Sequence, residues 1–417
     1  MTRFNYTLDV GEMADTGRVQ ELNYKGKRAK YRVLKVPLSQ IYCNDQNGRI
    51  ISWVSKYEEE NKRLSDIADR EEYNNLVSGF IREAEGKRSY EKTKTNIKNI
   101  GQDKPGVVLK DGRIIDGNRR FTCLRDLYEE TKSDTYAYFD AVVLDETLDE
   151  QTEEGRKALK TLENRLQFGV EKEQEYNLVD RLLTIYKNCV SPRYFSDDEY
   201  FVQTNMSKKD FLNYKEASIL MMDFLDFFNM HGKYFFVRQK NMGASFLELV
   251  KAKRKASSDK EWDRIKPAFY IKLLRTKGIN ESGITRAIRK FINDYIKTPS
   301  YIKDILKNSI DVMDRINDLI TQPIPVDPVT LQSTINTDSE IGQKLDKHEA
   351  EVRETININK TRTYPIEMCE KALAKLNDIE IELIKYMKAE EKSKLLKCLN
   401  EIQRITEKCL NEIDNND

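Results

Sequence analysis

The 417-residue chain predicts an α+β fold, in which a small mixed-sheet domain is followed by a mostly helical region. Two observations lead to this prediction. Short runs of β-branched and aromatic residues, the usual composition of strands, occur in the segment 25–150. After residue 153, apolar residues recur almost everywhere at spacings of three and four, which is typical of amphipathic helices.

The mixed domain begins with a predicted strand at Tyr31, where apolar and polar residues alternate until the loop residues 44–48 (NDQNG). Residues 52–100 are strongly charged and predict helices. Their candidate core contacts are Leu64, Ile67, Leu76, Phe80 and Ile81. A last strand is predicted over residues 136–144 (YAYFDAVVL).

Between these elements, residues 101–127 (GQDKPGVVLKDGRIIDGNRRFTCLRDL) predict a strand, an Asp-Gly turn, a second strand and a helix. The helix starts beside Gly117, Arg119 and Arg120. Free backbone N–H groups, the positive end of the helix dipole and two guanidinium groups together suit a phosphate. A solvated helix start is the alternative interpretation.

The helical region divides into three predicted parts and a linker. Residues 151–230 contain helices in the order expected of a helix-turn-helix, with Ser207 as an N-cap three residues before Asp210. Residues 231–320 form a further helical domain, and the proline-containing segment 321–345 is the linker candidate.

Residues 346–417 predict a helical C-terminal module. Apolar residues alternate there at spacings of three and four, as in a coiled-coil seam suited to self-association. The seam consists of Leu395, Cys398, Ile402, Ile405 and Cys409. A helical hairpin that folds back on its own domain is an equally suitable arrangement.

Composition excludes several classes of protein. The 71 Lys and Arg residues nearly cancel the 70 Asp and Glu residues, so any nucleic-acid surface must be local. The two histidines and six cysteines show no zinc-site or disulfide pattern. The first residues lack a signal-peptide core, and no stretch has the length of a membrane span. We therefore expect a cytoplasmic protein without a membrane partner.

Four short motifs occur in an order that resembles the ParB/sulfiredoxin-like fold, and more closely the ParB-type N-terminal domain. They are residues 37–41 (PLSQI) with 47–49 (NGR), residues 101–108 (GQDKPGVV), residues 115–120 (IDGNRR) and residues 162–167 (LENRLQ). The similarity extends over residues 31–190.

The resemblance implies a nucleotide site for CTP or ATP with Mg. Gly117, Arg119 and Arg120 would hold the phosphates within the motif that also contains Asp116 and Asn118. Gln102 would lie nearby, Arg49 would face the same site, and Glu163 and Asn164 would bind magnesium. No catalytic residue is identified.

The chain departs from the family pattern at two positions. Asn118 replaces the glutamate of the family's G-E-R-R motif, and Gln167 replaces the arginine that ends E-N-x-x-R. Both changes bear on nucleotide specificity and hydrolysis. Residues 115–124 (IDGNRRFTCL) are also similar to the D-G-Q-Q-R-L-T-T-L motif of restriction-type NTPases that act in phage defence.

The helix-turn-helix candidate lies where ParB-type proteins place their DNA-reading domain. Lys208, Lys209 and Lys215 would contact phosphates there, with Asn213 available for a base edge. In the alternative, these helices are a plain bundle. The bundle's core would then contain Phe211, Ile219, Leu220, Phe224 and Phe228.

We therefore expect a nucleotide-binding protein that couples NTP and Mg binding to DNA binding or to clamp-like self-association as a homodimer. One alternative is an NTP-dependent nuclease or NTPase of the phage-defence type with the same fold. Another is a non-catalytic interaction protein in which the nucleotide site is degenerate.

Overall fold

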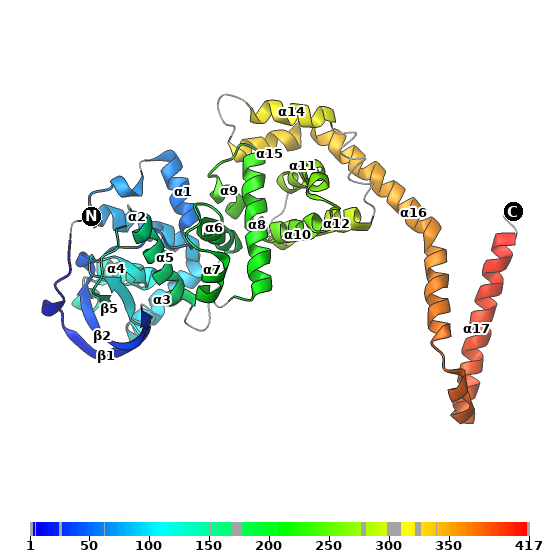
Figure 1. Ribbon diagram of the computed structural model, residues 1–417, viewed down its shortest axis with the longest axis horizontal. Coiled ribbons are helices and arrows are strands. Elements are labelled where there is room, and N and C mark those ends of the chain that lie inside the picture. Colours follow the sequence, from blue (N-terminus) through cyan, green and yellow to red (C-terminus); the bar gives the residue numbers. More distant parts are fainter. Residues whose placement is uncertain are drawn as a thin grey trace. The chain divides into compact units, whose positions relative to one another are not determined.

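The computed structural model confirms the α+β class: a five-stranded sheet in the N-terminal part is followed by helices (Figure 1). It describes all residues except 1–2, 5, 25–26, 62, 150–151, 169–176, 205, 277–280, 298–309, 322–326, 339 and 415–417. Contacts divide the chain into two compact units, residues 1–348 and residues 349–417.

The sheet has the strand order β1-β2-β5-β3-β4. Its strands are β1 (Asp15–Tyr24), β2 (Lys27–Pro37), β3 (Gly106–Leu109), β4 (Ile114–Asp116) and β5 (Tyr138–Leu144). Only the β3–β5 pair is parallel, so the sheet is mixed as predicted. The sheet starts at Asp15, earlier than the residue 25 predicted for the domain, because β1 pairs along β2.

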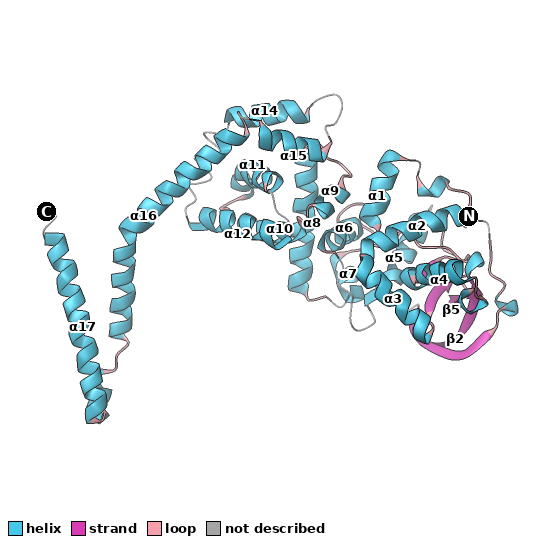
Figure 2. Cartoon of the chain, turned by 180° about the vertical axis from the view of Figure 1, so that it is seen from behind, coloured by secondary structure: helices cyan, strands magenta, loops and turns pink. Residues whose placement is uncertain are grey.

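Helices cover both faces of the sheet (Figure 2). One face packs against α2 (Arg70–Glu85), α3 (Lys87–Ile100) and α4 (Asn118–Thr131), whereas α5 (Glu153–Phe168) covers the other. The short buried strand β3 contributes to both cores, which accounts for its uninterrupted apolar sequence.

The remaining helices of the first unit follow in chain order. They are α1 (Ile51–Glu60), α6 (Leu178–Cys189), α7 (Asp197–Thr204), α8 (Lys208–Phe227), α9 (Tyr234–Gln239), α10 (Gly243–Lys253), α11 (Asp259–Arg275), α12 (Glu281–Lys297), α14 (Ile310–Ile320) and α15 (Pro328–Thr337). Short 3-10 helices lie at Val10–Glu12, Leu38–Gln40, Leu64–Asp66, Asp134–Tyr136 and, in the second unit, Ile381–Tyr386.

In the segment predicted as a linker, 321–345, the described residues include helix α15 (Pro328–Thr337) and the start of a further helix at Gly342. Helix α15 buries Leu331 and Ile335, and donates a 2.6 Å hydrogen bond from Gln332 Nε2 to the carbonyl of Leu274 in α11. Asp327 caps the helix and Pro328 occupies its first turn, so prolines that resemble linker composition instead start a helix here. Residues 322–326 of the predicted linker lie outside the described residues.

Helix α16 (Gly342–Asn377) runs from the end of the first unit into the second, and α17 (Ala389–Asp414) follows it. The second unit starts close to the predicted boundary at residue 346. In the part of the chain that the structure describes, no helix is both long and apolar enough to span a membrane.

Candidate functional site

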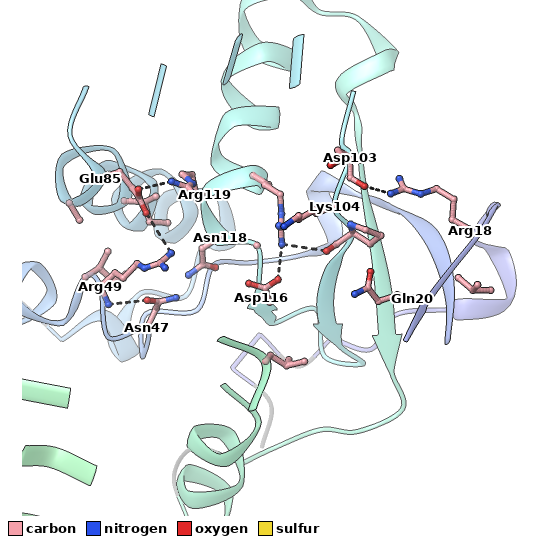
Figure 3. Close-up of a pocket in the computed structure, with 18 residues that line it drawn as sticks. Arg18, Gln20, Asn47, Arg49, Glu85, Asp103, Lys104, Asp116, Asn118 and Arg119 are labelled. Carbon is pink, nitrogen blue, oxygen red and sulfur yellow. Dashed lines mark hydrogen bonds and ion pairs between the residues drawn. The ribbon is translucent and has the colours of Figure 1, made fainter. Parts of the chain in front are cut away.

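A cavity of about 560 Å³ opens beside the start of α4 (Figure 3). Its walls come from β1, the loop after Asn47, the end of α2, the loop before β3, and the turn from β4 into α4. This volume is in the range of small-molecule sites. The structure brings together there six predicted nucleotide contacts, namely Arg49, Asp116, Gly117, Asn118, Arg119 and Arg120.

Gly117 begins α4 in a conformation that suits glycine, with φ at 114°. A Cβ atom at this position would lie 2.7 Å from Cζ of Phe139, a buried ring of the sheet. Gly117 has no side chain with which to cap α4, and the first N–H groups of a helix have no acceptor within it. The helix start therefore presents backbone donors beside the cavity.

Arginines and carboxylates share the cavity wall. Glu85 accepts a 2.7 Å hydrogen bond from Arg119 and lies 3.8 Å from Arg49, so one carboxylate serves two guanidinium groups. Asp116 pairs with Arg120 at 2.7 Å. Arg18 and Lys104 also line the cavity, which brings its cationic side chains to five. They face three carboxylates, those of Glu85, Asp103 and Asp116. This excess of positive charge favours an anion.

Arg120 uses only some of its N–H donors within the described residues. Its Nη2 atom binds Asp116 and lies 3.4 Å from the carbonyl oxygen of Pro105. Its Nε atom is buried and has no hydrogen-bond partner among the described residues. A buried donor without an acceptor costs free energy, and an anion placed at the start of α4 would supply that acceptor.

The far side of the cavity is built by β1, which sequence reasoning did not predict as part of the site. Arg18 donates to the carbonyl oxygens of Gln102, at 2.9 Å, and Asp103, and it lies 3.3 Å from Asp140. Burial raises the pKa of Asp140 more than the Arg18 guanidinium lowers it.

Gln102 lies outside the cavity lining, contrary to the role expected for it. Its side-chain amide donates to the carbonyl of Asp140 and accepts from the backbone N–H of the same residue, both at 2.8 Å. These bonds fasten the loop before β3 to strand β5. Gln102 therefore supports the cavity wall rather than the ligand.

Asn118 connects the cavity to the predicted magnesium ligands. Its amide exchanges two hydrogen bonds with the backbone of Asn44, at 2.9 and 3.0 Å, and the Asn44 side chain donates to Glu163. The Asn118 side chain is thus engaged with the backbone of Asn44.

Glu163 is also paired with Lys160 at 2.9 Å, and Asn164 donates to Gln203 at 3.3 Å. Neither Glu163 nor Asn164 lines the cavity. Among the described residues, no three or more histidine, cysteine or acidic side chains are grouped so that they could hold a metal ion. These two residues, as arranged, fit a structural network better than a magnesium site.

The predicted DNA-contacting helix is α8. Ser207 caps it by accepting from the backbone N–H of Asp210, as predicted, and Lys208 and Lys209 are exposed beside this cap. Lys215 is held by both carboxylate oxygens of Asp197 in α7, at 2.6 and 2.7 Å, which offsets its charge. Asn213 is half-buried.

Much of α8 is core. Phe211, Leu220 and Phe224 are buried in it, as is Phe228 directly after it, whereas Ile219 is exposed. The turn residue Asn205 of the predicted helix-turn-helix lies outside the described residues.

Sequence reasoning missed Arg18, Glu85 and Lys104 as cavity residues. Lys104 lies inside the motif 101–108 and could have been found there. Arg18 and Glu85 belong to no recognised pattern, and only the pairing of β1 and the packing of α2 bring them to the site.

Comparisons of this chain with family models, with curated proteins and with solved structures give no match. Functional inference therefore depends on the residues and their geometry.

Proposed function

We propose that this chain binds a nucleoside triphosphate, CTP or ATP, in the cavity at the start of α4, as a ParB-like nucleotide-binding protein. The observation that carries the proposal is the buried Nε of Arg120, which lacks an acceptor beside a helix start led by Gly117. The cationic excess of the cavity and the ordered motifs of residues 31–190 support the same proposal.

The arrangement suggests how phosphates would be held. The backbone N–H groups at the start of α4 and the Nε of Arg120 would donate to one phosphate group. Arg119 and Arg49 would bind a second phosphate group, which would take over part of their interaction with Glu85. The apolar side chains of Ile50, Ile81 and Ala84 line the same cavity and suit the less polar part of a nucleotide.

Magnesium enters the proposal as an ion carried by the phosphates, because the predicted protein ligands do not line the cavity. Magnesium commonly keeps several waters and is bound through substrate phosphates with few protein ligands. Titrations with and without the ion therefore belong in the test.

The test is isothermal titration calorimetry of the full chain with CTP, ATP, GTP and UTP, each with and without magnesium. We expect one of the first two to bind, and Arg120→Ala to weaken binding roughly 100-fold, since hydrogen bonds to charged groups are worth about 1.5–3 kcal/mol. The matched control is Lys208→Ala/Lys209→Ala, which removes an exposed basic pair outside the cavity. Absence of binding for all four nucleotides would overturn the proposal.

We further propose that nucleotide binding changes the affinity of the chain for DNA or for a second copy. Helix α2 is the physical link, because its end carries the cavity residues Ala84 and Glu85. Arg238 of α9 donates a 3.2 Å hydrogen bond to the carbonyl of Ala84 and pairs with the buried Asp180 of α6. A shift of Glu85 would thereby reach α6, against which the DNA-binding candidate α8 packs.

The coupling is tested by filter binding of duplex DNA at fixed salt with and without the bound nucleotide. The proposal expects a change in affinity that Arg120→Ala removes, whereas identical affinities would contradict it. Phosphate release or DNA cleavage in the same mixtures would favour the NTPase or nuclease alternative.

A further inference from the structure

Helix α17 carries a wide apolar face that remains open to solvent. Six of its large aliphatic side chains are 38–61 % exposed, and Cys398 and Cys409 are exposed with them, whereas Leu395 is half-buried. The aliphatic members are Leu396, Leu399, Ile402, Ile405, Leu410 and Ile413. No residue of this helix is buried. A face of this kind in a 26-residue helix normally marks an interaction surface.

The face has the order of a heptad repeat. Leu395, Ile402 and Cys409 occupy one core position, a, whereas Cys398 and Ile405 occupy the other, d. Charged residues border one side of this seam at position g, namely Lys394, Glu401 and Lys408. The other border of the seam, position e, carries no charge: it consists of Leu399, Thr406 and Ile413.

A parallel pair of such helices gains nothing from these charges. In that geometry position g of one helix meets position e of the next heptad in the other. Glu401 would face Thr406 of the second copy, and Lys408 would face Ile413. No ion pair forms, and a charged side chain lies against an aliphatic one.

An antiparallel pair matches these charges in its central layers, although the register described below sets Leu395 opposite Glu412 of the second copy. With its twofold axis between Gln403 and Arg404, Ile402 of each copy packs against Ile405 of the other. In the same register the g positions face each other, so Glu401 of each copy lies beside Lys408 of the second copy. Glu401 already pairs with Arg404 in its own helix, and Lys408 adds a second cation.

We propose that α17 is a homodimerisation surface in which two copies of this helix pair antiparallel, with Glu401 and Lys408 forming two symmetric ion pairs. This inference does not depend on nucleotide binding. The register also places Cys398 opposite Cys409 of the second copy, whereas the two Cys398 residues lie about 16 Å apart along the axis.

The thiols allow a direct test of orientation in the full chain. Two variants are made, each with one exposed thiol. Cys369→Ser/Cys409→Ser retains Cys398, and Cys369→Ser/Cys398→Ser retains Cys409. Cys43, Cys123 and Cys189 are buried, and burial raises the pKa of each thiol to about 12, so they do not compete for the reagent. Each variant, and a mixture of the two, is treated with a short bis-maleimide whose span is well under 16 Å.

The antiparallel pair predicts cross-linked dimers in the mixture and almost none in either variant alone. Cross-linking of each variant by itself, without a gain in the mixture, would show a parallel pair and overturn the proposal. A monomer in sedimentation velocity at tens of micromolar would overturn it as well.

A charge exchange tests the ion pairs. Glu401→Lys places two cations side by side on each side of the twofold axis and should weaken dimerisation roughly 10-fold, whereas Glu401→Lys/Lys408→Glu should restore it. Glu407→Lys makes the same charge change at position f, away from the seam, and serves as the matched control. If the control weakens the dimer as much as Glu401→Lys, the ion pairs do not form.

Discussion

Helices α4 and α8 both carry two basic residues in their first turn, but they begin in opposite ways. Gly117 leaves the start of α4 without a side-chain cap and opens it to a cavity, while Ser207 caps α8 with its own hydroxyl. Arg120 keeps a buried donor without a partner, whereas Lys208 and Lys209 are exposed to water. Two basic residues in the first turn therefore do not suffice for an anion site. The uncapped helix start, the cavity and the buried donor make α4 the candidate.

The largest effect is expected from a side chain at the N-cap of α4. Gly117→Ala forces a Cβ toward Phe139 at a φ of 114° and should lower the free energy of unfolding by about 2–3 kcal/mol. Urea denaturation of the full chain measures the change. Gly79→Ala in α2 is the control, because a Cβ there meets no atom within 4 Å and alanine favours helix. Equal effects of the two changes would contradict the steric argument.

A second prediction concerns α6, on which α8 packs. Burial, with the nearby charge of Lys160, lowers the pKa of Lys187 from 10.5 to about 8. Keeping Lys187 charged therefore lowers the free energy of unfolding. This destabilisation is at its full value below pH 8 and disappears as the pH rises toward 10.5. We expect Lys187→Met to be more stable than the wild type by about 1–2 kcal/mol at pH 7.

The pH dependence makes this prediction specific. The advantage of Lys187→Met should shrink steadily when thermal unfolding is followed from pH 8 to pH 10. An advantage that stays constant over this range would instead point to better packing by methionine. Arginine cannot lose its charge in this range. The advantage of Lys187→Met over Lys187→Arg should therefore stay constant from pH 8 to pH 10.

The cap of α8 gives a smaller effect. Ser207→Ala removes the acceptor for the backbone N–H of Asp210 and should cost about 1 kcal/mol. Ser207→Asn retains a capping side chain and should restore most of the loss, as measured by thermal denaturation. If alanine and asparagine behave alike, the cap does not stabilise α8, and the contrast with α4 is weaker than the structure indicates.

The smallest effect is expected at the carboxylate that pairs with the arginines near the start of α4. Glu85→Gln frees Arg119 and Arg49 from their shared carboxylate, so the affinity for tripolyphosphate should rise roughly threefold in calorimetry. Glu71→Gln is the matched control, since Glu71, like Glu85, belongs to α2 and pairs with an arginine of α4, Arg125, but does not line the cavity. Weaker binding by Glu85→Gln would mean that this carboxylate orients the arginines.

Local patterns predicted the elements around the site well. The Asp111-Gly112 turn joins β3 to β4, and α4 follows Gly117 as predicted. The apolar residues that recur at helical spacing along α4 are all buried, namely Phe121, Cys123, Leu124 and Leu127. Turn chemistry and helical periodicity act over a few residues, so one sequence is sufficient to recognise them.

Long-range placement was harder to predict. Strand β1 was not expected, and Arg18 reaches the cavity only because β1 pairs with β2. The prolines after residue 322 suggested a linker, but Pro328 starts a helix whose Leu331 and Ile335 pack inward. The same residue types occur in both settings, and tertiary contacts decide between them.

The α+β class and the glycine-led, arginine-bearing start of α4 could be predicted from the sequence, because these features depend on neighbouring residues. The folded chain was needed to see that Glu85 pairs with Arg119 and Arg49, that Gln102 supports the cavity wall, and that Glu163 pairs with Lys160. Charge balance and burial at a site are sums over residues that are distant in the chain, so they exist only once the chain has folded.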